Sequence, residues 1–142
     1  MKSLVLTLGT FLFSLGSFAQ AEKSSSKDTA ILTFEKSEHN FRTIIEGQIA
    51  TYEFKFTNTG TLPIVLSNVK ASCGCTTPKW PREAIMPGES NVIRAEYNSN
   101  GRPGTFHKNI FVTSDAGKQT LTIKGNVVSE PEKPKSPIII NN

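Results

Sequence analysis

Residues 50–57 read Ala-Thr-Tyr-Glu-Phe-Lys-Phe-Thr, and this stretch decides the fold class. Apolar side chains occupy every second position of it, and polar side chains fill the positions between them. The apolar positions are Ala50, Tyr52, Phe54 and Phe56. Because successive side chains of a β-strand point to opposite faces, this period of two predicts a strand with one buried face. The Asn-Thr-Gly at 58–60 predicts a turn directly after it.

The same alternation recurs on both sides of this strand. The other expected strands cover residues 32–34, 41–45, 62–66, 93–97, 106–112 and 121–127. Within 106–112, Lys108 is the one charged residue at a position of the apolar face. Glycine-containing turns separate these segments, and no window sustains a helical period. About seven strands in ~100 residues predict an all-β, immunoglobulin-like antiparallel β-sandwich, with a small barrel as the alternative.

The composition suits one soluble domain. The chain has 142 residues, of which 37% are hydrophobic and 20% charged, and its net charge is +4. This length fits a single domain, and the supply of Phe and Ile excludes wholesale disorder. Because the basic residues are scattered rather than clustered, we expect no nucleic-acid partner.

Residues 1–21 predict a secretory signal peptide. Lys2 precedes a short apolar run at 4–13, and a small, polar stretch ends in an Ala-x-Ala pattern at 19–21. A retained membrane anchor is the alternative, but the run is shorter than the ~20 apolar residues that a spanning helix needs. We therefore expect cleavage, no stable membrane span afterwards, and a mature chain in the periplasm or outside the cell.

Three segments follow the signal peptide. Residues 22–29 are polar and predict a flexible leader, 30–128 carry the strand pattern and form the expected domain, and 129–142 are a proline-rich tail. Ile138, Ile139 and Ile140 stand out near the end. They are either a frayed terminus or a short strand that docks on a sheet edge.

Cys73-Gly74-Cys75 is the most concentrated chemistry in the sequence. In an extended strand, residues two apart lie about 6.6 Å apart at Cα, near the upper limit of ~6.8 Å for a disulfide. A bridge therefore needs a local bend, which Gly74 permits. Closing a three-residue loop contributes only about 1.5 kcal/mol, so stability alone explains such a bridge poorly.

Three interpretations of Cys73 and Cys75 remain open beside unpaired, inert thiols. A local disulfide fits an exported protein and needs no cofactor. A redox dithiol is the second interpretation, although the thioredoxin spacing is missing. Binding of Cu(I) or Zn(II) is the third: two thiolates do not complete a zinc site, but they suffice for linear Cu(I). The two histidines, His39 and His107, are expected at solvent-facing or edge positions.

Trp80 lies shortly after the cysteines, within Pro-Lys-Trp-Pro at 78–81. It either covers one end of the core or is an exposed aromatic anchor for a partner. The sequence shows no convincing nucleophile–base set, phosphate loop or His-Glu metal motif. We therefore expect no enzymatic activity.

Several motifs together carry a family resemblance. They are residues 54–60, Pro63, Ile64, Ser-Cys-Gly-Cys-Thr at 72–76, Pro78, Trp80, Pro-Gly-Glu-Ser at 87–90, and Gly-Arg-Pro-Gly-Thr-Phe at 101–106 with Lys108. The chain resembles the domain of unknown function family 1573, common in exported Bacteroidetes proteins. Arg42 stands where that family often has Gly after an aromatic residue. The resemblance implies an immunoglobulin-like fold, akin to abnormal-spindle/Hydin and PapD-like sandwiches, and implies no defined activity, substrate or partner.

These observations predict an exported, non-catalytic binding or structural module with a protein partner in the cell envelope. The partner would engage an exposed sheet edge or the loop between Cys73 and Trp80. The alternative is a thiol protein that handles copper or redox equivalents through Cys73 and Cys75. A pilus-type chaperone is disfavoured, because the sequence shows no basic carboxylate-binding cleft.

Overall fold

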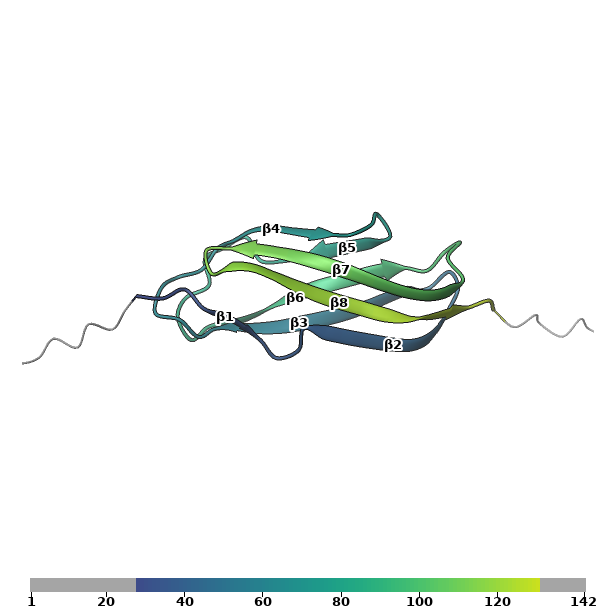
Figure 1. Cartoon of the computed structure of the whole chain (residues 1–142), viewed down its shortest axis with the longest axis horizontal. Coiled ribbons are helices and arrows are strands. Elements are labelled where there is room, and N and C mark those ends of the chain that lie inside the picture. Colours follow the sequence, from purple (N-terminus) through teal and green to yellow (C-terminus); the bar gives the residue numbers. More distant parts are fainter. Residues whose placement is uncertain (1–27, 131–142) are drawn as a thin grey trace, which may run out of the picture.

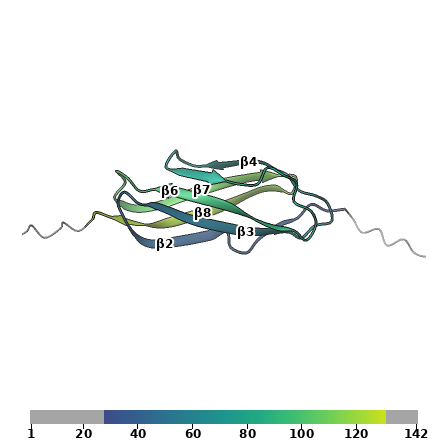
Figure 2. The ribbon, with the colours of Figure 1, turned by 180° about the vertical axis from the view of Figure 1, so that it is seen from behind.

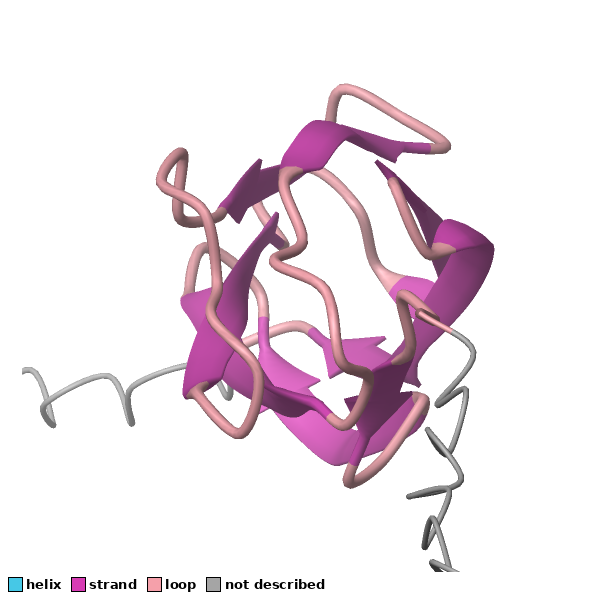
Figure 3. Cartoon of the chain, turned by 90° about the vertical axis from the view of Figure 1, so that its left-hand side faces the viewer, coloured by secondary structure: helices cyan, strands magenta, loops and turns pink. Residues whose placement is uncertain are grey.

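The structure is a computed structural model that describes residues 28–130. These residues form eight strands joined by loops, without a helix (Figure 3). The strands are β1 (Leu32–Phe34), β2 (Glu38–Ile45), β3 (Ile49–Asn58), β4 (Leu66–Ala71), β5 (Thr76–Lys79), β6 (Ser90–Asn98), β7 (Gly104–Ser114) and β8 (Gly117–Val128). Within 28–130 no helix is long and apolar enough to cross a membrane. The all-β prediction is confirmed.

The strands form two four-stranded sheets (Figures 1 and 2). One sheet has the order β1-β3-β6-β5 and the other has the order β2-β8-β7-β4. Paired strands are antiparallel except β2 and β8, which run parallel. The sandwich prediction is thus confirmed and the small barrel is wrong, while the strand count is eight rather than about seven.

The core lies between the two sheets. Phe54 and Phe56 on β3 are almost fully buried, and Phe54 lies opposite Ile93 in the β3–β6 ladder. The second sheet contributes Ile110 from β7 and Ile123 from β8 to the same cluster. Apolar burial of this kind is the main favourable term in folding. Residues 50–57 therefore lie in a strand that buries Phe54 and Phe56 on one face, as their alternation predicts.

The middle of the chain differs from the expected strands at two points. The strand expected at 62–66 is not continuous: Ile64 makes only an isolated bridge with Ile85, and β4 starts at Leu66. Pro63 lacks an N–H donor, which opposes a ladder there. Strand β5 was not expected, because its Thr-Thr-Pro-Lys sequence has no apolar alternation.

A bulge interrupts β2 at Arg42. Its φ of 59° lies in the left-handed region, and the register with β8 shifts between Asn40 and Thr43. The Arg42 N–H donates to Asn40 Oδ1 at 2.8 Å, which holds the bend. Because glycine adopts this φ without steric cost, a glycine would fit this bulge with less backbone strain than Arg42 does.

The described chain enters at one end of the long axis and leaves at the other (Figures 1 and 2). Its strands run from Leu32 to Val128. Residues 1–27 and 131–142 lie outside the described part. The signal peptide, most of the leader and the three isoleucines of the tail therefore stay predictions.

Candidate functional site

The chain changes from one sheet to the other at one corner of the sandwich. Strand β4 ends at Ala71, which lies opposite Ile110 on β7. The chain then crosses in residues 72–75, and β5 begins in the other sheet with Thr76 beside Tyr97. The first half of β7, before Ile110, thus has no β4 neighbour. This part of β7 therefore forms a local edge of its sheet.

The crossover contains the Cys73–Cys75 disulfide. The two Cα atoms lie 5.3 Å apart, closer than in an extended strand, so the predicted bend is present. Backbone hydrogen bonds fix the turn to both sheets: the Ser72 N–H donates to Asn109 O at 2.8 Å, and the Asn98 N–H donates to Cys75 O at 2.9 Å. The bridged turn therefore forms a fixed wall at the corner.

The bend leaves room for a side chain at Gly74. Its φ is not in the left-handed region, and a Cβ atom added there would meet nothing within 4 Å. A side chain could therefore be accommodated at position 74. The bend is therefore present with Gly74 in it, but neither a left-handed φ nor a lack of space requires glycine there.

The two cysteines are bonded to each other, and the described residues around them contain no cluster of metal-ligand side chains. Among residues 28–130 no cysteine is free, and no group of three His, Cys, Asp or Glu side chains could hold a metal ion. Neither histidine lies at the disulfide. His107 is exposed on β7, and His39 is half-buried on the edge strand β2, where its ring stacks on Tyr52 with centroids 3.6 Å apart.

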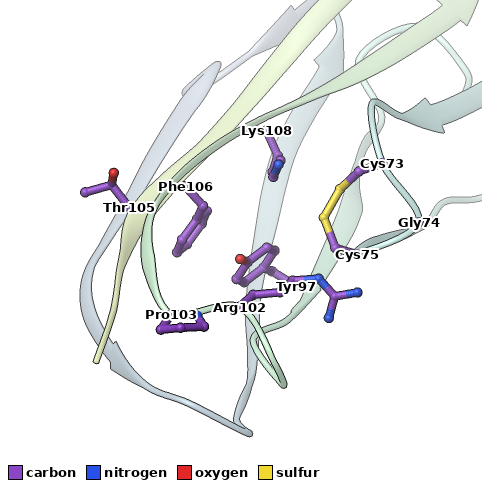
Figure 4. Close-up of a pocket in the computed structure, with 9 residues that line it drawn as sticks. All are labelled: Cys73, Gly74, Cys75, Tyr97, Arg102, Pro103, Thr105, Phe106 and Lys108. Atoms are coloured by element: carbon purple, nitrogen blue, oxygen red, sulfur yellow. A yellow bond between two sulfur atoms is a disulfide. The ribbon is translucent and has the colours of Figure 1, made fainter. Parts of the chain in front are cut away.

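A pocket of about 560 Å³ opens beside the disulfide (Figure 4). We call it the corner pocket. Its lining residues are Cys73, Gly74, Cys75, Tyr97, Arg102, Pro103, Thr105, Phe106 and Lys108. Figure 4 shows the disulfide on one side and Phe106 on the other, with Tyr97 between them. The pocket thus collects residues from the crossover, β6, the β6–β7 loop and β7.

Two aromatic rings form the floor of the corner pocket. Tyr97 and Phe106 are buried, and their rings stack with centroids 4.0 Å apart and planes 14° apart. Burial raises the pKa of the Tyr97 hydroxyl, and the nearby positive charge of Arg102 opposes that rise. The hydroxyl is therefore a neutral donor and acceptor at ordinary pH.

Gly125 on β8 fixes the position of the Phe106 ring. It pairs with Phe106 in the β7–β8 ladder, and a Cβ atom there would lie 2.8 Å from two carbons of the ring. It would also lie 3.1 Å from Arg42 O. Real Cβ atoms essentially never come within 3.0 Å of another heavy atom, so a side chain at position 125 would force the Phe106 ring to shift.

Two basic side chains border the corner pocket. Arg102 is exposed in the β6–β7 loop, and its Nη1 donates to Asn98 O at 3.3 Å and to Asn100 O at 2.7 Å. Lys108 is half-buried on β7. The lining includes no carboxylate. A basic cleft that the sequence does not show is therefore present in the fold.

Trp80 lies away from the corner pocket. It follows β5 and packs against the core, half-buried, so the structure does not place it at the lining beside Cys73 and Cys75. Its Nε1 is buried and makes no hydrogen bond within the described residues. The Arg82 guanidinium carbon lies 3.8 Å from the ring centroid, a cation–π distance.

Three lining residues carried little functional signal in the sequence. Tyr97 and Phe106 follow the apolar alternation and are read as core, and Arg102 is one residue of a turn motif. Lys108 did carry a signal, because a charge at an apolar-face position implies an opening in the core there. Strand periodicity does not reveal which loops meet at that opening.

The family model for Protein of unknown function (DUF1573) matches residues 32–127, which is most of the described chain. The chain belongs to this family. The resemblance inferred from the sequence motifs is thus confirmed. A search of curated proteins found no match.

Solved structures show the same fold. A protein of unknown function from Porphyromonas gingivalis W83 matches with 14% identity and a TM-score of 0.61, over 75% of this chain and 51% of that one. PapD-like domain 7 of human CEP192 matches with 6% identity and a TM-score of 0.63, over 90% of this chain and 100% of that one. The Vibrio cholerae VesB protease matches with 12% identity and a TM-score of 0.50, over 68% and 31%.

These identities are low enough that the likeness concerns the fold alone. The chain spans about half the length of the Porphyromonas gingivalis protein and about a third of the protease. The fold of the domain is therefore an immunoglobulin-like or PapD-like sandwich.

Proposed function

We propose that this chain is an exported, non-catalytic binding module of the cell envelope, and that it contacts a protein partner through the corner pocket. The observation that carries the proposal is the composition of that pocket. It combines a buried aromatic floor, a fixed disulfide wall and two basic side chains at a mouth open to solvent. Apolar surface with a few placed polar groups is typical of recognition sites.

The sheet edges favour this pocket over strand addition. Strand β1 has three residues, β5 contains Pro78, and β2 is bulged at Arg42. The fourth edge strand, β4, carries the exposed Lys70. Short, bulged, proline-containing or lysine-bearing edges all oppose pairing with another chain. A partner therefore finds better complementarity at the corner than along an edge.

Two features support export. The sequence of residues 1–21 has the three regions of a secretory signal. The Cys73–Cys75 bridge fits an oxidising compartment, where disulfides persist. Both features point to the periplasm or the cell exterior.

Site-specific photo-crosslinking in the native cells tests the contact. A photoreactive residue replaces Thr105, which is exposed at the corner pocket, or Lys118, which is exposed at the opposite end of β7 and β8. We expect a discrete crosslinked protein from position 105 and none from position 118. The same products from both positions, or none from position 105, would overturn the proposal.

Intact mass of the protein from its exported fraction tests export and the cysteines together. We expect a chain that has been cleaved near residues 19–21. Its mass should be two hydrogens below that of the reduced form, and it should take up no alkylating agent. Two alkylated thiols with bound copper or zinc would instead favour the thiol-based copper or redox alternative. An uncleaved chain would remove export from the proposal.

A further inference from the structure

The two basic residues of the corner pocket share one opening that no carboxylate lines. Lys55, Lys79, Arg94 and Lys124 each lie within ion-pair distance of a glutamate. Arg102 and Lys108 have no such partner among residues 28–130. The nearby Glu46 carboxylate accepts a hydrogen bond from the Gly101 N–H at 3.1 Å and makes no ion pair with Arg102. The pocket therefore presents two uncompensated positive charges.

The loop holds Arg102 in place for binding. Its Nη1 donates to two backbone carbonyls, that of Asn98 at the end of β6 and that of Asn100 in the loop. The guanidinium has five N–H donors in a planar fork, so donors on its other nitrogens stay available. An arginine that is already oriented loses less conformational entropy when it binds an anion.

Lys108 lies where the local sheet edge is open. An inward-pointing lysine at such an edge can simply block pairing with another chain. That explanation does not extend to Arg102, which belongs to a loop and lines the same pocket. Two cations from different elements converge on one opening, and an anionic group is what both would bind.

We propose that the corner pocket binds a carboxylate that a partner polypeptide carries next to an apolar group. The carboxylate would accept hydrogen bonds from Arg102 and Lys108, and the apolar group would lie against Tyr97, Phe106 and the disulfide. This inference rests on the proposed function and specifies the chemistry of the contact. A terminal carboxylate and an acidic side chain both supply that chemistry.

Titration of the purified protein with small probes, followed by amide shifts in NMR, tests the chemistry. N-acetylphenylalanine offers a ring and a terminal carboxylate, and N-acetylphenylalanine amide offers the ring alone. An amide-capped Phe-Glu dipeptide offers the ring and a side-chain carboxylate. We expect both acids to shift the amides of Cys75 and Phe106, and the amide to bind about tenfold more weakly, as for loss of a charge-assisted hydrogen bond. Equal binding of the amide and both acids would overturn the inference.

Charge-removing variants sharpen the test. R102Q and K108Q should each weaken binding of N-acetylphenylalanine about three- to tenfold, whereas K118Q, at the far end of the molecule, should leave it unchanged. Melting temperatures of all three variants check that the fold is intact. Acetate and inorganic phosphate serve as anions without a ring. If they bind as tightly as N-acetylphenylalanine, the apolar half of the inference is wrong.

The two proposals fail in different ways. If the acids bind but position 105 crosslinks to nothing, the carboxylate site stands and the protein partner does not. If position 105 crosslinks equally well in the R102Q and K108Q background, the partner stands and the carboxylate does not. Crosslinking that falls in both single variants and stays in K118Q supports both proposals.

Discussion

Aromatic residues have different roles at the centre of the β3–β6 ladder and at the disulfide corner. In the centre, nine residue pairs run without a register break, and Phe54, Phe56 and Ile93 have no more than 1% of their surface exposed. At the corner, β4 has ended and β5 has just begun, and the aromatic rings of Tyr97 and Phe106 lie at the floor of an open pocket. Aromatic residues fill space in the first region and line a site in the second.

The difference shows how a small sandwich can leave a pocket open at one corner while its central ladder stays closed. Loops and element ends tolerate polar groups and open surface because a rigid scaffold holds them in place. Here the scaffold is the continuous ladder, and the opening is placed where the chain changes sheets. Substitutions in the centre should therefore change stability, and substitutions at the corner should mainly change binding.

The largest effect is expected at the centre. Replacement of Phe56 by Ala should lower the free energy of unfolding by about 3–5 kcal/mol, because it deletes a fully buried ring and leaves a cavity. Urea unfolding measures the loss. The matched control is F111A, which removes a ring that is 46% exposed on β7 and should cost much less. A near-neutral F56A would mean that the scaffold is not built around this ladder.

The floor of the corner should respond to a single added methyl group. In G125A the new Cβ collides with the Phe106 ring, so we expect a loss of about 1–3 kcal/mol, the usual range for overpacking. G74A is the control, since its added Cβ meets nothing within 4 Å and should leave the free energy of unfolding nearly unchanged. A double variant with Phe106 replaced by Leu should recover part of the G125A loss. If G125A is as mild as G74A, the ring is not held by the glycine.

The fold was predictable because it rests on period-two patterns that each strand carries locally. The alternation at 50–57 and at 93–97 lies in the continuous β3–β6 ladder. Strand β5 was missed because it is a strand by virtue of its pairing with β6, whereas its own Thr-Thr-Pro-Lys sequence has no apolar alternation. A strand defined by its neighbour leaves no period in the sequence.

The site was only half predictable for a related reason. Cys73 and Cys75 are conspicuous by residue type, and Lys108 breaks an apolar face. Arg102 and Tyr97 join them only because a loop and a strand end meet at the same corner. Such long-range placement is a property of the topology, which explains why Trp80 is near the cysteines in sequence and yet lies outside the pocket.

Removal of the disulfide should separate stability from binding. Replacing Cys73 and Cys75 together by Ala should cost about 1.5 kcal/mol or less, because the bridge closes a loop of only three residues. Urea unfolding measures this loss, and the N-acetylphenylalanine titration measures binding by the same variant. We expect the acid to bind several-fold more weakly, since one wall of the pocket is no longer fixed. Unchanged binding would show that the bridge serves only the fold.

The bulge at Arg42 offers a gain in stability away from both regions. Arg42 adopts a left-handed φ of 59°, which is strained for a residue with a Cβ and unstrained for glycine. R42G should therefore raise the free energy of unfolding by about 0.5–1 kcal/mol, seen as a higher urea midpoint. The control is T51G, at an exposed position of regular strand, which should lower it. Destabilisation by R42G would mean that the arginine side chain contributes more than the backbone strain costs.

His39 should give the smallest effect, and one that depends on pH. Burial against the Tyr52 and Phe41 rings, and then the charge of Lys36, lower the pKa of His39. The fold thus favours the neutral form of the imidazole. The stability that the neutral ring contributes is fully present above the ordinary pKa of about 6.5, and it is lost as the pH falls through the lowered pKa. Urea unfolding at pH 8 and at pH 5 gives the free energy of unfolding that is lost between the two pH values. This loss should be smaller for H39Q than for the unmodified chain. H107Q, which leaves His39 in place, should lose as much as the unmodified chain. Equal losses of unfolding free energy in all three proteins would show that protonation of His39 does not affect stability.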